Sequence, residues 1–451
     1  MKTKHYLYRI ALFCGILLLF ACDKNSASSD LEPDRHPQLV LTASSSEVSE
    51  GDEITFSITA DNKSVVADIY IDNEKIDGDK WTFEQAGSYK VIAKKSGYLD
   101  SENLQITVNE SDVSHEVDIY VVGLHGMTIQ EATSNHGEVW KNGETLYTLE
   151  NLGRAVGNVD IALHNDDVYV VGTRRAPRDP LGWTASYWKN NVVADFPSTT
   201  ANGSSEVSKA VFSENDMYAI GSGNNGHIAA YWKNFFIHPV ESGSTNVYAK
   251  GLAVENENLY IVGHKTVRNS SQQLINKIVL WKNGIPADIT GTQNNALALD
   301  VAVENGSIYL LGRENDHADN NKYTAKYWIN GEPKALVESI NVDVYPEAIA
   351  VKDGDVYVCG GLVDPNSNKG FRAMVWKNGE RLYELTDGTY TAEALDIAID
   401  GNDIYVVGYE KSGSQRTDRN IAKVWKNGEV LYALTDGTRH ARAFSLAIKR
   451  K

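Results

Sequence analysis

The stretch "IAKVWKNGEVLYAL", residues 421–434, alternates apolar and polar side chains on both sides of a Trp-Lys-Asn-Gly sequence. An alternation with a period of two is typical of β-strands, and Asn-Gly accepts the positive φ values of a type I′ turn. The stretch therefore predicts a β-hairpin that turns at Asn427 and Gly428. A Trp followed two places later by Asn occurs seven times, at Trp140, Trp188, Trp232, Trp281, Trp328, Trp376 and Trp425.

These Trp residues stand 44 to 49 residues apart, and two further signatures keep the same spacing. One is an apolar strand that ends in Gly, such as "DIYVVG" at 403–408, and the other is an Ala-rich strand, such as "DIAI" at 396–399. Each repeat then holds four strands, in the order Ala-rich (a), Tyr-Val-Gly (b), Trp (c) and the strand after Asn-Gly (d). A four-stranded repeat of this length is typical of a propeller blade. The sequence predicts an all-β protein with a seven-bladed β-propeller.

The series of repeats starts and ends in the middle of a repeat. The first complete signature is a strand b at Asp118, and the last is a strand a at "AFSLAIKR", residues 443–450. We expect the C-terminal strand to complete the first blade, because a closed ring leaves no exposed sheet edge. In one repeat Phe235 replaces the Gly, and we expect that turn to change its type, since bulky residues resist positive φ.

The residues before the repeats divide into three parts. Residues 1–21 have basic residues and then the apolar run "IALFCGILLLFA", the pattern of an export signal. Residues 22–36 are polar and are expected to form a tether. Residues 37–110 alternate in short strands, which predicts a small β-sandwich, and residues 111–451 then form the propeller.

Two of these parts resemble known classes. The stretch "LFAC", residues 19–22, resembles the lipobox of bacterial lipoproteins, and this implies cleavage before Cys22 and a lipid on that residue. The segment "AGSYKVIAKKSGY", residues 86–98, resembles bacterial immunoglobulin-like (Ig-like) or PKD-like domains. Residues 37–451 resemble the lipid-anchored YWKNG-repeat propeller proteins of Gram-negative bacteria. The resemblance implies an outer-membrane location, facing the periplasm or the cell surface, and transfers no site.

The formal net charge of −17 argues against a nucleic-acid partner, because phosphate binding needs clustered cations. No motif for a nucleotide, a zinc ion or a nucleophilic serine is present, and we expect no cofactor. The loop around residue 317 is rich in oxygen ligands and is a weak candidate for a calcium site, because it lacks EF-hand spacing. Its candidate ligands are Asp316, His317 and Asp319.

Variable loops on one side of the predicted ring are the expected binding surface, since loops on a rigid scaffold commonly carry binding residues. Flat aromatic side chains beside basic and polar groups suit a glycan or an anionic peptide. The candidates are Arg174, Arg175, Arg178, Trp183, Tyr248, His264, Arg268, Tyr345 and Tyr390.

Two functions remain open from the sequence. The first is a membrane-anchored, non-enzymatic module that binds a glycan or a surface protein. The second is a hydrolase or lyase acting on carbohydrate, with inward carboxylates such as Asp160, Asp300 and Asp396 as acid and base. Because other repeats place Lys209, Gly251, Ala348 or Ser445 at the same point, hydrogen bonding within the scaffold is the simpler role for these carboxylates.

Overall fold

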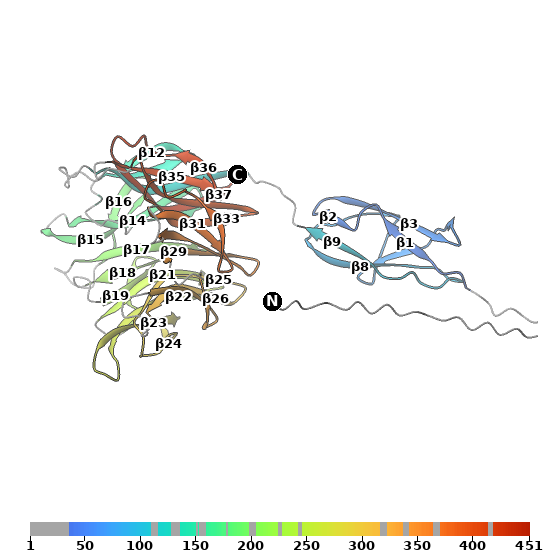
Figure 1. Cartoon of the computed structure of the whole chain (residues 1–451), viewed down its shortest axis with the longest axis horizontal. Coiled ribbons are helices and arrows are strands. Elements are labelled where there is room, and N and C mark those ends of the chain that lie inside the picture. Colours follow the sequence, from blue (N-terminus) through green and yellow to red (C-terminus); the bar gives the residue numbers. More distant parts are fainter. Residues whose placement is uncertain are drawn as a thin grey trace, which may run out of the picture. The chain divides into compact units, whose positions relative to one another are not determined.

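The structure is a computed structural model (Figure 1). It describes residues 36–109, 116–127, 136–149, 152, 159–176, 179–197, 204–223, 228–241, 246–315, 323–336, 342–363, 370–413 and 418–451. Every regular element in these ranges is a β-strand, which confirms the all-β prediction. The chain divides into two compact units, Met1–Asp112 and Val113–Lys451.

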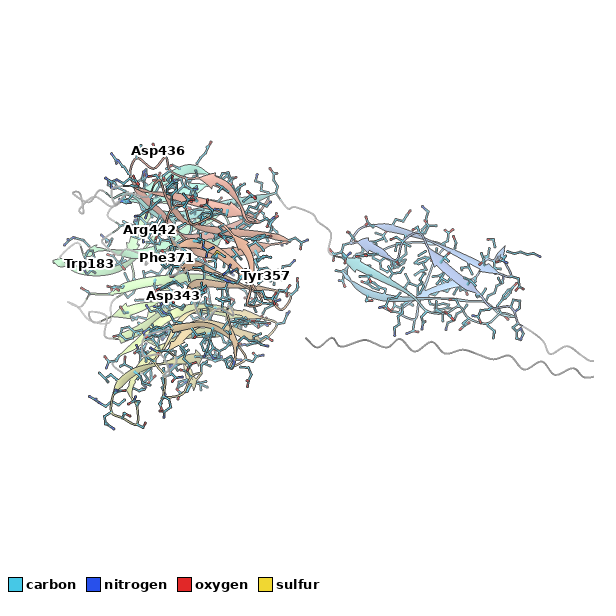
Figure 2. All side chains as sticks on the ribbon, in the orientation of Figure 1. Trp183, Asp343, Tyr357, Phe371, Asp436 and Arg442 are labelled. Atoms are coloured by element: carbon cyan, nitrogen blue, oxygen red, sulfur yellow. The ribbon has the colours of Figure 1, made fainter. Side chains whose placement is uncertain are left out.

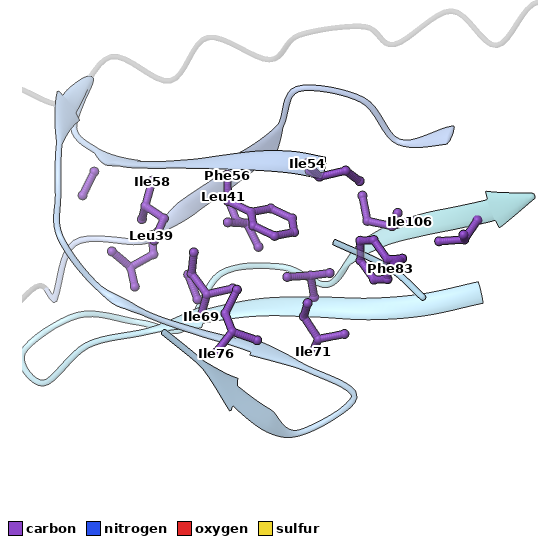
Figure 3. Packing of buried hydrophobic residues seen from close by; sticks show 14 residues of the cluster. Leu39, Leu41, Ile54, Phe56, Ile58, Ile69, Ile71, Ile76, Phe83 and Ile106 are labelled. Atoms are coloured by element: carbon purple, nitrogen blue, oxygen red, sulfur yellow. The ribbon is translucent and has the colours of Figure 1, made fainter. Parts of the chain in front are cut away.

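The first unit contains two sheets that share one hydrophobic core, in which Ile54, Val91 and Ile106 are fully buried (Figure 3). Strand β3 alternates exposed or half-buried residues with buried ones, as expected for a sheet with one face on a core. One sheet contains β1 (Val40–Ala43), β3 (Glu53–Ala60), β4 (Lys63–Ser64) and β7 (Lys80–Thr82). The other has the order β2 (Glu47–Ser49), β9 (Leu104–Asn109), β8 (Gly87–Lys94), β5 (Asp68–Ile71), β6 (Glu74–Ile76).

The second unit contains seven four-stranded antiparallel sheets within its described residues. The first sheet has β10 (Val117–Met127), β11 (His136–Lys141), β12 (Glu144–Leu149) and the C-terminal β37 (His440–Arg450). The next three are β13 (Asp160–His164), β14 (Asp167–Ala176), β15 (Asp179–Lys189), β16 (Val192–Asp195); β17 (Glu206–Ser213), β18 (Asp216–Gly223), β19 (Ile228–Lys233), β20 (Phe236–Pro239); and β21 (Val247–Glu255), β22 (Asn258–Arg268), β23 (Leu274–Lys282), β24 (Ile285–Asp288). The last three are β25 (Ala296–Glu304), β26 (Ser307–Asn315), β27 (Tyr323–Ile329), β28 (Glu332–Ala335); β29 (Asp343–Lys352), β30 (Asp355–Val363), β31 (Arg372–Lys377), β32 (Glu380–Glu384); and β33 (Ala392–Asp400), β34 (Asp403–Lys411), β35 (Asn420–Lys426), β36 (Glu429–Ala433).

These sheets form a closed ring, because one edge strand of each sheet contacts the corresponding edge strand of the next sheet. The contacts run from β13 through β17, β21, β25, β29 and β33 to β37, and β37 contacts β13. We call these seven the inner strands. Four-stranded sheets arranged around an axis are the β-propeller architecture. The repeated Trp side chains are buried between neighbouring sheets, where Trp140 packs with Tyr405 and Val424 of the last sheet.

The C-terminal strand completes the first sheet. β37 pairs antiparallel with β10, with Asp118 opposite Lys449 and Val122 opposite Ser445. On one side the backbone N–H of Leu446 donates to the Asp396 carboxylate over 3.0 Å, and on the other the Ser445 hydroxyl donates to Asp160 over 2.6 Å. Strand β37 therefore bonds to the sheets on both of its sides as well as to β10.

The Asn that stands two places after each repeated Trp joins the turn between strands c and d to the start of strand b. In the first sheet the Ile119 N–H donates to Asn142 Oδ1 over 2.8 Å, and Asn142 Nδ2 donates to Asp118 over 2.8 Å. The preceding Lys141 forms an ion pair with Asp118 and lies over the ring of Tyr120. This network explains why Asp, Tyr, Lys and Asn recur together. The same Oδ1 bond is made by Asn190, Asn234, Asn283, Asn330, Asn378 and Asn427.

The expectation that Phe235 changes its turn is wrong. Asn234 has φ 48° and Phe235 has φ 69°, similar to the 52° and 88° of Asn142 and Gly143. The Phe235 ring packs against Tyr187 with ring centroids 4.8 Å apart. Aromatic packing of this kind offsets the strain of a bulky residue at positive φ.

Six inner strands carry a β-bulge at the same level, and this feature positions the site. In β21, for example, Lys250 is the extra residue between Ala249, which faces Gly263, and Gly251, which faces Val262. The last Gly of the strand b signature lies inside the strand and makes the bulge possible, because a Cβ on Gly263 would lie 1.9 Å from the Tyr248 carbonyl oxygen. The bulge residues are Ser208, Lys250, Leu299, Glu347, Leu395 and Phe444.

Candidate functional site

A pocket of about 390 Å³ lies among the inner strands at the level of the bulges. Four of its lining residues are the bulge residues Ser208, Lys250, Leu299 and Glu347, which come from four consecutive sheets. A bulge re-aims the side chain of its extra residue, and here it turns these side chains into the channel of the ring. The pocket has the volume typical of a small-molecule site.

Tyr248 provides the aromatic wall of this pocket. It is 42% exposed, and its ring stacks on the buried His264 with centroids 5.0 Å apart. Burial, with Lys250 nearby, lowers the pKa of His264 to about 4, so this imidazole is neutral at physiological pH. His264 thus acts as a support for Tyr248, whose outer surface faces the pocket.

Carboxyl and phenol groups lie together on the side of the channel formed by β29, β33 and β34. Glu347 is open to the pocket, yet the channel walls remove much of its water, and this burial together with Glu393 raises its pKa to about 7. The Tyr409 hydroxyl donates to Glu393 over 2.9 Å, and Arg442 lies 4.3 Å from the centre of the Tyr409 ring. Burial and Glu393 raise the pKa of Tyr409, so the phenol stays protonated. The site therefore holds a carboxyl group that is partly protonated at neutral pH beside one that accepts a hydrogen bond.

The inward aspartates predicted as possible acid and base bond to the scaffold. Besides its bond from Leu446, Asp396 accepts from the N–H of Ile397. Asp160 and Asp300 accept from the inner strand of the following sheet, through the N–H groups of Ala210 and Ile349 respectively. Burial raises the pKa of Asp160 and raises that of Asp396 to about 6. These bonds connect neighbouring sheets.

Lys209 interacts with all three inward aspartates. Its ammonium group donates to Asp300 over 2.5 Å, and Asp160 and Asp396 interact with the same charge. Burial alone would lower the pKa of Lys209, but the three carboxylates raise it above its ordinary value. The ammonium therefore stays charged and offsets part of the negative charge of the three carboxylates.

The structure places Arg174, Arg175 and Trp183 on the hairpin of β14 and β15, away from the pocket. Arg174 forms a bidentate salt bridge with Asp195. Its Nε donates to Oδ1 over 2.8 Å and its Nη2 donates to Oδ2 over 2.6 Å. Arg175 lies 5.1 Å from the centre of the Trp183 ring. Figure 2 shows Trp183 near the outer end of this hairpin, with Phe371 and Arg442 farther from that end. These three candidates form a separate group.

The remaining described candidates divide between the pocket and its surroundings. Tyr248 lines the pocket and His264 supports it. Tyr345 packs against Phe371 with centroids 4.8 Å apart, and Arg268 donates to the carbonyl of Gln272 at the end of its hairpin. Tyr390 is exposed in the segment before β33.

Cys22, Arg178, Asp316, His317 and Asp319 lie outside the described residues. Within the described part of the chain, no group of three or more His, Cys, Asp or Glu residues is arranged to hold a metal ion. The same part contains no helix that is long and apolar enough to cross a membrane.

Sequence reasoning missed Lys250, Glu347, Glu393, Tyr409 and Arg442, although a signal for them was present. The last Gly of the strand b signature recurs in every repeat, and a Gly inside a strand often marks a bulge. The residue after this Gly, by contrast, differs in chemistry between repeats. It is Leu124, Thr173, Ser222, His264, Arg313, Gly361 or Tyr409.

No family model matches the chain, and no curated protein sequence matches it. Among solved structures, the β-propeller domain of the Trilobed protease from Pyrococcus furiosus is similar, with 12% identity and a TM-score of 0.47 over 71% of this chain and 93% of that one. An oligogalacturonate lyase in complex with manganese has 9% identity and a TM-score of 0.38 over 72% and 85%. A DUF4623 family protein from Bacteroides eggerthii has 10% identity and a TM-score of 0.31 over 89% and 90%. The propeller assignment rests on the ring of sheets described above.

Proposed function

We propose that this protein is a non-enzymatic saccharide-binding module that takes the end of a glycan into the pocket at the bulge level. The observation that carries the proposal is Tyr248, an exposed ring held flat by His264 on the wall of a polar pocket. A flat aromatic face suits the apolar face of a sugar ring, and Glu206, Ser208 and Lys250 can bond to sugar hydroxyls. A concave site of this size favours a glycan end over a protein surface, which needs a much larger contact area.

The test is binding of a glycan panel by the full chain and by a Tyr248→Ala variant. Loss of one aromatic contact costs about 1 kcal/mol, so we expect affinity to fall by roughly fivefold to tenfold. A Tyr390→Ala variant is the matched control, because Tyr390 is exposed but does not line the pocket. Equal affinities of the Tyr248→Ala variant and the native chain would refute the assignment of the pocket.

A second function, glycoside hydrolysis, is favoured by one observation. Glu347, with its pKa near 7, lies close enough to Glu393 for the Glu393 carboxylate to raise that pKa. A protonated carboxyl beside an ionised one is the pair that general acid–base hydrolysis uses. In this reaction Glu347 would give its proton to the leaving oxygen while Glu393 takes one from water. New reducing ends that disappear in a Glu347→Gln variant would establish hydrolysis and replace the non-enzymatic proposal.

We also propose the finer architecture and location. The ring is a seven-bladed propeller closed by β37 and comprises residues 111–451, and the first unit is an Ig-like sandwich of residues 37–110. Residues 1–21 are a signal peptide, residues 22–36 a tether, and lipid on Cys22 holds the protein at the outer membrane as in the YWKNG-repeat lipoproteins. Incorporation of labelled palmitate by the native chain, and its absence in a Cys22→Ala variant, tests the anchor.

A further inference from the structure

The pocket at the bulge level is lined by charged side chains of both signs. They are Glu206 on β17, Lys250 on β21 and Glu347 on β29, which belong to three different sheets. Within the described part of the chain, none of these three side chains has a hydrogen-bond or ion-pair partner. The wall of the pocket therefore keeps one ammonium donor and two carboxyl groups available to a ligand.

Opposite charges elsewhere in the ring are in direct contact across neighbouring strands, as Lys326 is with Glu314 over 2.7 Å. Lys250 and Glu347 differ from such a pair. The Lys250 charge acts to lower the pKa of Glu347, against the effect of burial, so the two groups are close enough to interact. Both line the pocket, yet no ion pair joins them among the described residues. The space between these opposite charges can thus take ligand groups of either sign.

The mixture of signs disfavours a ligand that carries a single charge. An anionic ligand would meet two carboxyl groups, and a cationic ligand would meet Lys250. Wall charges that repel a ligand lower its affinity, and they discriminate between ligands in this way. A neutral sugar can bond to either sign, but each bond is then assisted by one charge and not by two. A ligand with both a positive and a negative group gives every charge on the wall an ionic partner.

We infer that the ligand of this pocket is a zwitterionic saccharide, with an amino group that bonds to Glu206 and Glu347 and a carboxylate that bonds to Lys250. Its ring lies on Tyr248, whose exposed face is supported on the pocket wall by His264. This inference rests on the proposed saccharide-binding function and names the chemical class of its ligand.

The test compares four related sugars, whose binding to the full chain is measured by calorimetry at about pH 6.5, where a sugar amine is protonated. N-acetylglucosamine is neutral, glucosamine carries an ammonium group, N-acetylmuramic acid carries a carboxylate, and muramic acid carries both. We expect muramic acid to bind about tenfold more tightly than either singly charged sugar, because it alone pairs with both signs on the wall. High salt should reduce this advantage.

Two variants test which wall residue binds each charge of the ligand. Lys250→Met should lose about tenfold in affinity for muramic acid and nothing for glucosamine. Glu206→Gln should lose affinity for muramic acid and glucosamine by a similar factor, and lose nothing for N-acetylmuramic acid. Lys334→Met and Glu332→Gln, matched changes on the exposed outer strand β28, should leave all four affinities unchanged.

The outcomes separate this inference from the proposed function. If N-acetylglucosamine or either singly charged sugar binds as tightly as muramic acid, and Tyr248→Ala weakens that binding, the zwitterionic ligand is overturned and saccharide binding stands. Glycine that competes as well as muramic acid would also overturn the inference, because the sugar ring would then contribute nothing. Absence of binding by every sugar would overturn both proposals. The order of the four affinities on the native chain decides the question even if Lys250→Met or Glu206→Gln fails to fold.

Discussion

One asparagine in each sheet of the ring connects the turn between strands c and d to the start of strand b. Asn142 has φ 52°, a value that Asn adopts more readily than most residues. Its backbone N–H donates to the Ile119 carbonyl while its Oδ1 accepts from the Ile119 N–H, so one residue satisfies both backbone groups of another. Gly143 follows with φ 88°. The repeated Asn-Gly therefore has a structural role in the fold.

Replacement of Asn142 by Ala should destabilise the ring by about 2 kcal/mol. The change removes two side-chain hydrogen bonds and leaves Ala at a positive φ. The measurement is the midpoint of urea unfolding, with Glu144→Ala, an exposed change in the same hairpin, as the control. An unchanged midpoint in the Asn142 variant would show that this network contributes nothing to stability.

At the level of elements, strand b and the bulged strand a depend on each other. Gly408 faces Ala394 in the pairing of β33 with β34, and a Cβ on Gly408 would lie 2.0 Å from the Glu393 carbonyl oxygen. The Gly is thus required by the bulge at Leu395, and the same bulge level holds Lys250 and Glu347 in the pocket. The bulges therefore position the pocket residues on the inner strands.

We expect Gly408→Ala to lower the melting temperature strongly, because the backbone of Glu393 and Ala394 would have to move away from the new methyl group. The control is Gly291→Ala, where an added Cβ has no atom within 4 Å and the φ is not positive. Thermal unfolding followed by circular dichroism compares the two. Equal melting temperatures would mean that the bulge adapts without cost.

The closing strand gives a second prediction at this scale. Besides its ladder with β10, β37 forms ion pairs through Arg450 with Asp400 and through Lys449 with Asp166. Removal of residues 443–451 should leave two neighbouring sheets without these partners and expose the edge of β10. We expect the shortened chain to aggregate in size-exclusion chromatography. A soluble monomer with the native melting temperature would refute closure by β37.

At the scale of the whole molecule, two sets of carboxyl groups act on stability in opposite directions. Burial raises the pKa of Glu347 to about 7 and of Asp396 to about 6, so both bind a proton more tightly in the folded chain than in the unfolded one. Their ionisation therefore lowers stability as pH rises from about 4 through these values. Lys141 and Lys377 instead lower the pKa of Asp118 and Asp355, which contribute stability that is lost only as pH falls below about 4.

The melting temperature should consequently rise when the pH is lowered from 8 to about 5.5, and fall again in stronger acid. In a Glu347→Gln variant the rise should be smaller, because one of the two groups no longer titrates. Glu332→Gln, on the exposed strand β28, should retain the full rise. A native chain whose melting temperature falls steadily from pH 8 to 5.5 would contradict the raised pKa values of Glu347 and Asp396.

The sequence alone determined the parts of this protein that local rules control. Strand periodicity, the Asn-Gly turns and the spacing of Trp residues predicted an all-β chain of four-stranded repeats, because each depends on residues close together along the chain. The series of repeats starts with a strand b and ends with a strand a, and this offset predicted the pairing of β37 with β10. The register of Asp118 with Lys449 confirms that pairing.

Only the tertiary structure decided which side chains share a site. Lys250, Glu347 and Arg442 stand in different repeats, and their positions around the ring depend on its closure and on the bulges in six of the inner strands. The sequence directed attention to Arg174 and Trp183 on a long hairpin, and the structure instead pairs Arg174 with Asp195 there. Bulges and contacts between sheets are long-range properties, and a residue's type and spacing do not report them.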